Sequence, residues 1–381
     1  MSDPFSFLTA GQILFGRGQS KKAAGMVRGF GGRVLLVRGR SVAFADTLRQ
    51  ELEDTGADVC EVFCSAEPDV DMVRAGLDAG RRAECTVVVS VGGGAVVDLG
   101  KALAALLPGT TDVMDHLEGV GGGAPLAADP MPFVAIPTTS GTGAEVTKNA
   151  VIAVPEAGRK VSLRDDRMLP DIALIDPALT DGAPRAVTLA AGLDAVTQVI
   201  EPFLCNRSNP LTDTLCRAAI PQGLRALATL ERTEDPAARD AMAFCSLAGG
   251  LALANAGLGA VHGLAGVLGG RLGAPHGLIC GRLLGPVLEA NAREMQRIGA
   301  DTIRFDEVAS MLSVSRVLPD GDFARIQPLL DRWNVRRLDQ WVRQDTDLEA
   351  IAAEAETASS MRANPCRLPR QTLVDIIRDA L

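Results

Sequence analysis

The sequence contains no tyrosine, and aromatic residues make up only 3% of its 381 residues. We therefore expect hydrophobic cores built from Ala, Val, Leu and Ile, with 40 glycines that let backbones approach closely. The chain also lacks any block of Lys or Arg, and its formal net charge is −9. Because such a surface repels polyanions, the sequence predicts no nucleic-acid partner.

No pair of the eight cysteines has the C-x-x-C spacing of a zinc knuckle or a thiol redox site. We expect reduced, apolar cysteine side chains, because disulfides are rare in the cytosol. The N-terminus carries Asp3 and Pro4 and lacks the basic segment and apolar core that are typical of a signal peptide. These features predict a cytoplasmic protein.

One stretch is long enough to cross a membrane, since residues 241–270 contain no Asp, Glu, Lys or Arg. It also contains eight glycines, together with Ser246, Asn255 and His262, which suit a lipid environment poorly. We interpret it as the buried centre of a helical domain and predict no membrane partner.

Two patterns divide the chain. In residues 1–182, short apolar runs alternate with helical periodicity, which predicts a parallel α/β sheet with crossover helices. In residues 183–381 the strand patterns disappear, which predicts an all-α second domain. The expected strands are 33–37, 58–63, 86–91, 133–136 and 172–175, and the expected helices are 42–55 (capped by Ser41), 69–82, 96–107, 187–204, 211–229, 237–253, 257–268 and 276–293.

Two loops in the first half have the composition of a nucleotide site. Gly92, Gly93 and Gly94 lie between a predicted strand and a predicted helix, where backbone N–H groups can approach a pyrophosphate. Residues 137–147 follow another predicted strand and contain five hydroxyl side chains and two glycines. Either loop alone is consistent with a tight structural turn, but the pair favours a dinucleotide site.

Five motifs, in the expected order along nearly the whole chain, resemble the iron-containing (group III) alcohol dehydrogenases. They are GGGAVVDLGKA (92–102), PTTSGTGAEVTKNAVI (137–152), LPDIALIDPALT (169–180), GLDAVTQVIE (192–201) and VHGLAGVLGGRLGAPHG (261–277). The resemblance implies a Rossmann-like parallel sheet followed by a helical domain, the architecture shared with dehydroquinate synthase. It also implies a homodimeric oxidoreductase that interconverts a small aldehyde or ketone with an alcohol by hydride transfer to or from NAD(P).

The same resemblance implies the cofactor-binding residues. Gly93, Gly94 and Asp98 would hold the pyrophosphate and the nicotinamide side, and Asp98 is also a candidate catalytic residue. One departure is Ala95, where the family commonly has Ser. The remaining implied contacts are Ala95, Thr138, Thr139, Thr142, Thr147, Lys160 and Leu179.

The choice between NAD and NADP depends on the residue after the first predicted strand. NAD-preferring members place an Asp there, and its carboxylate binds the ribose 2′-hydroxyl. In this chain the corresponding position is Gly39, flanked by Arg38 and Arg40. A missing carboxylate and added guanidinium groups fit a 2′-phosphate, so NADP is slightly favoured. The alternative is that both arginines are solvated loop residues.

A metal site is expected in the second half. Asp194 and Gln198 are spaced i, i+4 on a predicted helix, and His262 and His276 flank a Gly-rich segment. In the family these four positions are Asp, His, His and His, and they bind one divalent ion, Fe²⁺ or Zn²⁺, that polarises the carbonyl oxygen. The two histidines are therefore also the candidate catalytic residues.

Gln198 departs from that pattern, because an amide oxygen is a weaker metal ligand than imidazole. Three interpretations follow. An ion binds through the other three residues with Gln198 as a weak ligand or as a partner of metal-bound water; the metal choice shifts to an ion that tolerates oxygen; or no metal binds, and His262 or His276 donates a proton to the carbonyl oxygen.

Four further positions bear on the expected site. Gly266 stands where many members have another histidine, which would enlarge the substrate pocket. We expect His116 to be a solvated helix residue, Glu201 to mark a helix kink before Pro202, and Cys280 to be inert packing. Two alternative functions remain: a metal-independent reductase of the maleylacetate-reductase type, and a cofactor-binding protein without catalysis.

Overall fold

The computed structural model describes residues 4–381, which form two compact units. The α/β unit comprises residues 8–139 and 143–181, and the helical unit comprises residues 4–7, 140–142 and 182–381. The fold therefore has the predicted class, a parallel-sheet α/β part followed by a helical part. Each unit is described by itself below.

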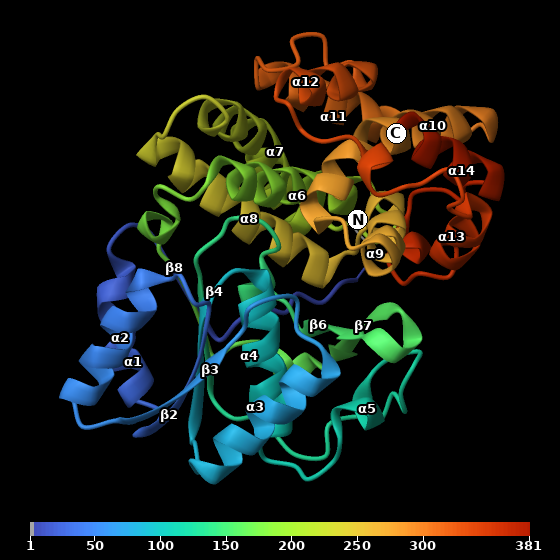
Figure 1. The fold of residues 1–381 in the computed structure, drawn as a ribbon. Coiled ribbons are helices and arrows are strands. Elements are labelled where there is room, and N and C mark those ends of the chain that lie inside the picture. The colour runs from blue at the N-terminus through green and yellow to red at the C-terminus, as the bar shows by residue number, and fades with distance from the viewer. Residues whose placement is uncertain (1–3) are drawn as a thin grey trace. The chain divides into compact units, whose positions relative to one another are not determined.

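A six-stranded sheet with the order β1-β8-β5-β4-β2-β3 forms the centre of the α/β unit, and every neighbouring pair is parallel (Figure 1). β4 is buried along its whole length, as expected for a strand covered on both faces. The strands are β1 (Gln12–Phe15), β2 (Arg33–Arg38), β3 (Asp58–Phe63), β4 (Val87–Gly92), β5 (Phe133–Pro137) and β8 (Ile172–Ile175).

Helices cover both faces of this sheet (Figure 1). Alternate residues of β2 separate the two cores, since Leu35 packs with α3 and α4 while Leu36 packs with α1 and α2. Asp69 caps α3 by accepting a hydrogen bond from the backbone N–H of Met72. The helices are α1 (Ala23–Arg28), α2 (Ala43–Asp54), α3 (Val70–Arg82), α4 (Gly94–Leu106) and α5 (Val113–His116).

Three strands and two local details of this unit were not predicted correctly. β1 was not predicted, because it is short and only partly buried. The antiparallel hairpin of β6 (Asn149–Val154) and β7 (Arg159–Arg164) was not predicted either, because its polar residues weaken the apolar pattern. The predicted Ser41 cap is wrong, because the N-cap position of α2 is Val42 and no side chain caps it.

His116 also differs from expectation. It is 4% exposed, with Nε2 2.7 Å from the Thr111 hydroxyl oxygen and Nδ1 2.9 Å from the carbonyl oxygen of Ala124. The prediction of a solvated residue is therefore wrong: the imidazole is a buried polar group whose two ring nitrogens both have partners, which fixes the loop after α5.

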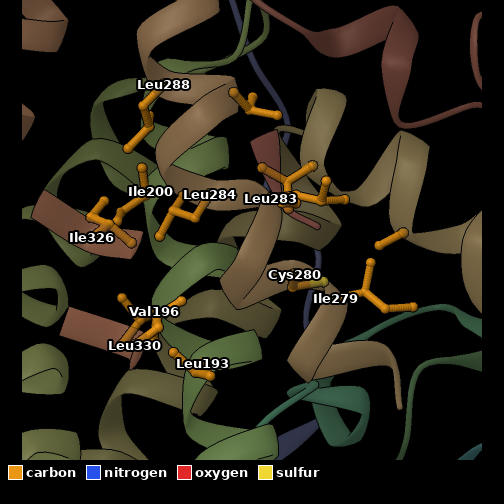
Figure 2. Close-up of a cluster of buried hydrophobic side chains, with 14 of the residues drawn as sticks. Leu193, Val196, Ile200, Ile279, Cys280, Leu283, Leu284, Leu288, Ile326 and Leu330 are labelled. Carbon is orange, nitrogen blue, oxygen red and sulfur yellow. The ribbon is translucent and has the colours of Figure 1, made fainter. Parts of the chain in front are cut away.

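The helical unit packs around α6, an almost uncharged helix that is buried on all sides from Leu193 to Leu204. Figure 2 shows its side chains Leu193, Val196 and Ile200 in one apolar cluster with Leu283 and other residues of α10. The helices are α6 (Arg185–Leu204), α7 (Pro210–Leu230), α8 (Pro236–Asn255), α9 (Ala260–Leu272), α10 (His276–Arg297), α11 (Ile303–Val314), α12 (Ile326–Arg332), α13 (Leu348–Ala355) and α14 (Arg370–Asp379).

Two of these helices, α6 and α8, are long and apolar enough to cross a membrane. In each, most of the 18-residue apolar window is buried inside the structure, 83% for α6 and 67% for α8. Core helices of globular domains have the same length and composition, which agrees with the interpretation of residues 241–270 as core.

Candidate metal centre and dinucleotide loops

Four side chains of the helical unit bring potential metal ligands together. Asp194 lies on α6, His262 on α9, and His276 and Cys280 on the first turns of α10; one ligand atom of each lies within 4.8 Å of all the others. Asp194 Oδ1 is 3.2 Å from His262 Nε2 and 3.9 Å from His276 Nε2, which in turn is 3.5 Å from Cys280 Sγ. The structure thus brings three of the four predicted metal residues together and adds Cys280.

The close approach of α10 to α6 positions this cluster. A Cβ atom at Gly277 would lie 2.0 Å from the carbonyl oxygen of Ala190, so only glycine lets α10 begin this near to α6. His276, the first residue of α10, is thereby placed beside Asp194. Its side chain keeps 35% of its surface exposed, whereas Asp194 and His262 are buried.

Glu201 orients His262. Its carboxylate accepts hydrogen bonds from the backbone N–H groups of Val261 (2.7 Å) and His262 (3.4 Å), and lies 2.5 Å from His262 Nδ1. A carboxylate at Nδ1 keeps the proton there and leaves Nε2 as the atom that faces Asp194. The expectation that Glu201 merely marks a kink is wrong, since its side chain is buried in direct contact with a candidate ligand.

The electrostatics of the cluster favour a positive charge. Burial opposes ionisation of Asp194, but the hydrogen bond from His262 and the charges of both imidazoles lower its pKa. Burial likewise disfavours charged histidines, but Cys280 and Asp194 outweigh it and raise the pKa of His276 to about 9. The pKa of His262 is also raised. A buried site that draws protons onto two imidazoles has the donor chemistry of a divalent-cation site.

Gln198 lies one turn after Asp194 and is 3% exposed. Its side-chain Nε2 donates a 2.6 Å hydrogen bond to the carbonyl oxygen of Thr142. The amide therefore ties α6 to residues 140–142, a segment that packs with the helical unit. Gly141 takes part in this contact, because a Cβ atom there would lie 3.1 Å from Ala191.

Gly266 lies one turn after His262 on α9 and is exposed. No heavy atom lies within 4 Å of where its Cβ would be, so a side chain at this position would meet open space. The expectation that Gly266 enlarges a substrate pocket stays a prediction.

In the α/β unit the two glycine- and threonine-rich loops lie side by side. Gly93 is the N-cap of α4 and makes no side-chain cap bond, and Gly94 and Ala95 begin the helix. Thr138 donates its backbone N–H to the carbonyl oxygen of Gly92 (2.9 Å), and a Cβ atom at Gly93 would lie 3.2 Å from the Thr139 hydroxyl oxygen. The helix N-terminus therefore keeps the open backbone that phosphate binding requires.

Asp98 is half-buried one turn into α4, and its Oδ2 accepts a 3.2 Å hydrogen bond from the backbone N–H of Val151. Burial raises the pKa of Asp98 to about 6, partly offset by the charge of Lys101. The carboxylate lies near the predicted pyrophosphate loop but has a neighbour in β6 that sequence analysis missed.

Lys101 is a buried charge that sequence analysis overlooked. Its Nζ donates to the carbonyl oxygens of Ala144 (2.7 Å) and Asn149 (2.8 Å) and to the Thr147 hydroxyl (2.9 Å). Thr147 is buried and also donates to Ala144. The structure therefore gives Thr147 the role of an anchor for its own loop. A lysine within a largely apolar helix, whose one other charged residue is Asp98, was the signal available for finding this anchor.

The residues near the expected adenosine end separate into different surroundings. Arg38 is 3% exposed and donates to Asp46 (2.6 Å) and Glu61 (3.0 Å), which leaves Arg40 as the exposed guanidinium beside Gly39. Arg40 lies 5.0 Å from the centre of the Phe63 ring. Two further predicted contacts are Lys160 on β7, which forms an ion pair with Glu67, and Leu179, which packs against the core of β2.

Comparison with known proteins accounts for both parts of the chain. The family described as iron-containing alcohol dehydrogenase matches residues 10–177, and its C-terminal domain family matches residues 188–381. The chain is 32% identical over 344 residues to alcohol dehydrogenase 4 of Saccharomyces cerevisiae (strain YJM789), covering 89% of this chain and 88% of that protein. It is 29% identical to the NAD-dependent methanol dehydrogenase of Bacillus methanolicus, covering 97% of each.

A crystal structure of 1,3-propanediol oxidoreductase superposes with a TM-score of 0.86, at 28% identity and with all of both chains covered. The family matches and this structural similarity cover the sheet, the helices and the cluster of Asp194, His262 and His276 alike. The chain therefore belongs to the iron-containing alcohol dehydrogenase family and is an NAD(P)-dependent oxidoreductase that interconverts alcohols with aldehydes or ketones.

Proposed function

We propose that this chain is a metal-assisted aldehyde or ketone reductase with a preference for NADPH. The observation that carries the proposal is the convergence of Asp194 Oδ1, His262 Nε2 and His276 Nε2 within the helical unit. Three donors of this kind around one point are the ligand set of a catalytic divalent ion. Such an ion polarises a carbonyl oxygen and so favours transfer of hydride to the carbonyl carbon.

Residues of the two units have separate roles in the proposed reaction. Glu201 holds the Nδ1 proton of His262, so that the imidazole presents its lone pair at Nε2. His276 supplies the third donor through Nε2, and its side chain is partly exposed to solvent. In the α/β unit, Gly93, Gly94 and Ala95 offer backbone N–H groups to the pyrophosphate, while Thr138, Thr139 and Asp98 line the dinucleotide. Thr142, Lys160 and Leu179 complete the proposed contacts.

The preference for NADPH rests on the two arginines that flank Gly39. The carboxylates of Asp46 and Glu61 already neutralise the charge of Arg38, so Arg38 alone would not stabilise a bound 2′-phosphate. Arg40 is exposed, and the N–H groups of its guanidinium can donate two parallel hydrogen bonds to a 2′-phosphate. No carboxylate stands at position 39 to repel that phosphate.

A panel of aldehydes and ketones, followed by the absorbance of reduced nicotinamide, tests the proposal. We expect kcat/KM to be higher with NADPH than with NADH, and activity to be lost on chelation and restored by a divalent ion. In Arg40→Ala, kcat/KM with NADPH should fall by about 10-fold, the loss of one charge-assisted bond, while NADH is used as before. A strong NADH preference in the parent protein would refute the cofactor assignment, and full activity after complete metal removal would refute the metal assignment.

We also propose that the protein is a cytoplasmic homodimer, on the basis of the family resemblance and of the reduced cysteines expected from the sequence. Light scattering coupled to size-exclusion chromatography measures the mass directly. A mass of one chain would contradict the dimer.

A further inference from the structure

The cluster in the helical unit leaves one question open: which residue completes the coordination of the ion. Asp194, His262 and His276 supply three donors, and a zinc ion in a protein commonly takes four, arranged as a tetrahedron. The side chain one turn after Asp194 is Gln198, whose amide nitrogen already donates to the carbonyl oxygen of Thr142. The atom of Gln198 that could bind an ion is its amide oxygen, which is a weaker ligand than imidazole or thiolate.

Cys280 is placed where that ligand belongs. It follows His276 by one turn of α10, and its Sγ lies 3.5 Å from His276 Nε2 and within 4.8 Å of the other two donor atoms. With metal–ligand bonds of about 2.0–2.3 Å, two ligand atoms of a tetrahedral ion are separated by about 3.3–3.8 Å. Of the observed separations, 3.5 Å lies inside this range and 3.2 and 3.9 Å lie just outside it, while the remaining pairs are within 4.8 Å, so small side-chain shifts would bring the four atoms onto one ion.

The surroundings of Cys280 also set it apart from the other cysteines of the core. Cys245 lies on α8 in the same apolar cluster and is equally inaccessible to solvent, and burial raises the pKa of its thiol to about 12. Such a thiol stays protonated and inert. Cys280 shares the apolar cluster on one side, as Figure 2 shows, but its sulfur atom lies against two imidazoles and a carboxylate.

We propose that Cys280 is the fourth metal ligand, bound as a thiolate, and that it replaces the imidazole missing at Gln198. This inference rests on the proposed metal-assisted function and deepens it. Binding releases the thiol proton to solvent. Asp194 and Cys280 together neutralise the two charges of the ion, and the soft sulfur makes the site selective for Zn²⁺ over Fe²⁺. When bound by Asp194, His262, His276 and Cys280, the ion would supply Lewis-acid polarisation of the substrate oxygen.

Cobalt substitution tests this directly, because Co²⁺ replaces zinc and a thiolate bound to Co²⁺ gives a charge-transfer band in the near ultraviolet. The parent protein, purified without a histidine tag and loaded with Co²⁺, should show that band. Cys280→Ala should lose it. Cys245→Ala is the matched control, since it removes the same atoms from an equally buried site, and it should keep the band.

Affinity gives a second readout. We expect Cys280→Ala to bind Zn²⁺ at least about 10-fold more weakly in chelator competition, and to lose about 10-fold in its preference for Zn²⁺ over Fe²⁺ under anaerobic conditions. Adding Gln198→His to Cys280→Ala should restore Zn²⁺ binding without restoring the charge-transfer band. A rescue of this kind separates a ligand role from a packing role.

The outcomes are distinct. Stoichiometric Co²⁺ with visible d–d bands but no charge-transfer band in the parent overturns the Cys280 inference and leaves the proposed metal-assisted function standing. A parent protein that binds neither Co²⁺ nor Zn²⁺ overturns both. Because the first measurement is made on the parent protein, a variant that fails to fold does not prevent the decision.

Discussion

At the scale of single residues, the candidate site depends on side chains of two kinds. Asp194, His262 and His276 are identified by motifs in the sequence, because a family resemblance carries ligand identities directly. Glu201 and Cys280 are found only from the structure. Both lie on the same helix face as a recognised ligand, at i+7 and i+4, but helical spacing alone does not say whether that face meets the cluster or the apolar core.

Glu201 offers a test of how His262 is held. Replacing it by Gln keeps the size of the side chain but removes the charge that stabilises the Nδ1 proton, so we expect Zn²⁺ affinity to fall by about 10-fold to 100-fold. Chelator competition measures the change. Glu349→Gln, an exposed change in the same helical unit, should leave the affinity unaltered. Equal affinity in Glu201→Gln and the parent would show that the carboxylate does not position the imidazole.

At the scale of elements, the long helices and the buried strands are predictable from the sequence, whereas strands that contain polar residues are not. The β-branched run of β4 predicts that strand, and the helical pattern of residues 187–204 predicts most of α6. The β6–β7 hairpin was missed, because charged residues such as Arg159 and Arg164 interrupt its pattern. This hairpin packs against α4 and contributes Val151 to the hydrogen bonding of Asp98, so a missed element concealed part of a candidate site.

The loop between β5 and β6 is anchored to α4 by a buried cluster with an unusual charge balance. Lys101 Nζ donates to two groups of this loop and to the first residue of β6, and burial lowers the pKa of Lys101 to about 8. Glu145 in the same loop is 3% exposed, and burial raises its pKa to about 7. Both groups therefore ionise less readily in the folded protein than in the unfolded chain.

The raised pKa of Glu145 predicts that its contribution to the free energy of unfolding depends on pH. Its pKa is raised in the folded state, so its contribution is fully present below the unfolded value of about 4.5 and is lost as the pH rises through about 7. Glu145→Gln removes this loss. The stability of the variant relative to the parent should therefore rise by on the order of 2 kcal/mol between about pH 5 and about pH 7.5.

Urea unfolding at a series of pH values measures this difference. The pKa of Lys101 is about 8 and depends in part on the charge of Glu145, so the series ends near pH 7.5, where Lys101 is still mostly charged. A difference in stability that stays constant with pH would contradict the prediction.

At the scale of the whole molecule, the two compact units carry different parts of the proposed chemistry. All four candidate ligands belong to the helical unit, whereas the glycine loop and most of the residues proposed to line the dinucleotide belong to the α/β unit. The division into two fold types was predictable from the change in pattern near residue 182. The sequence did not predict that residues 140–142 pack with the helical unit, because this packing depends on the contact between Gln198 and Thr142.

Hydrogen exchange should therefore report the two ligands separately. Zn²⁺ should slow amide exchange in α6 near Asp194 and at the starts of α9 and α10, because binding stabilises the elements that supply the ligands. NADPH should slow exchange at residues 92–98 and 138–139. Mass spectrometry of peptides from the metal-free and loaded protein gives both maps. Zinc-dependent protection that is spread evenly over both units would contradict this separation.

Gly266 is a position at which a larger side chain can be introduced. A glycine in the middle of α9 costs about 1 kcal/mol relative to alanine, and nothing in the structure occupies the space that a side chain would take. Larger residues can therefore be introduced one turn from His262 with a gain in helix propensity and no steric penalty in this structure. A single substitution at position 266 is therefore expected to leave the fold intact while it changes the surface one turn from the candidate ligand His262.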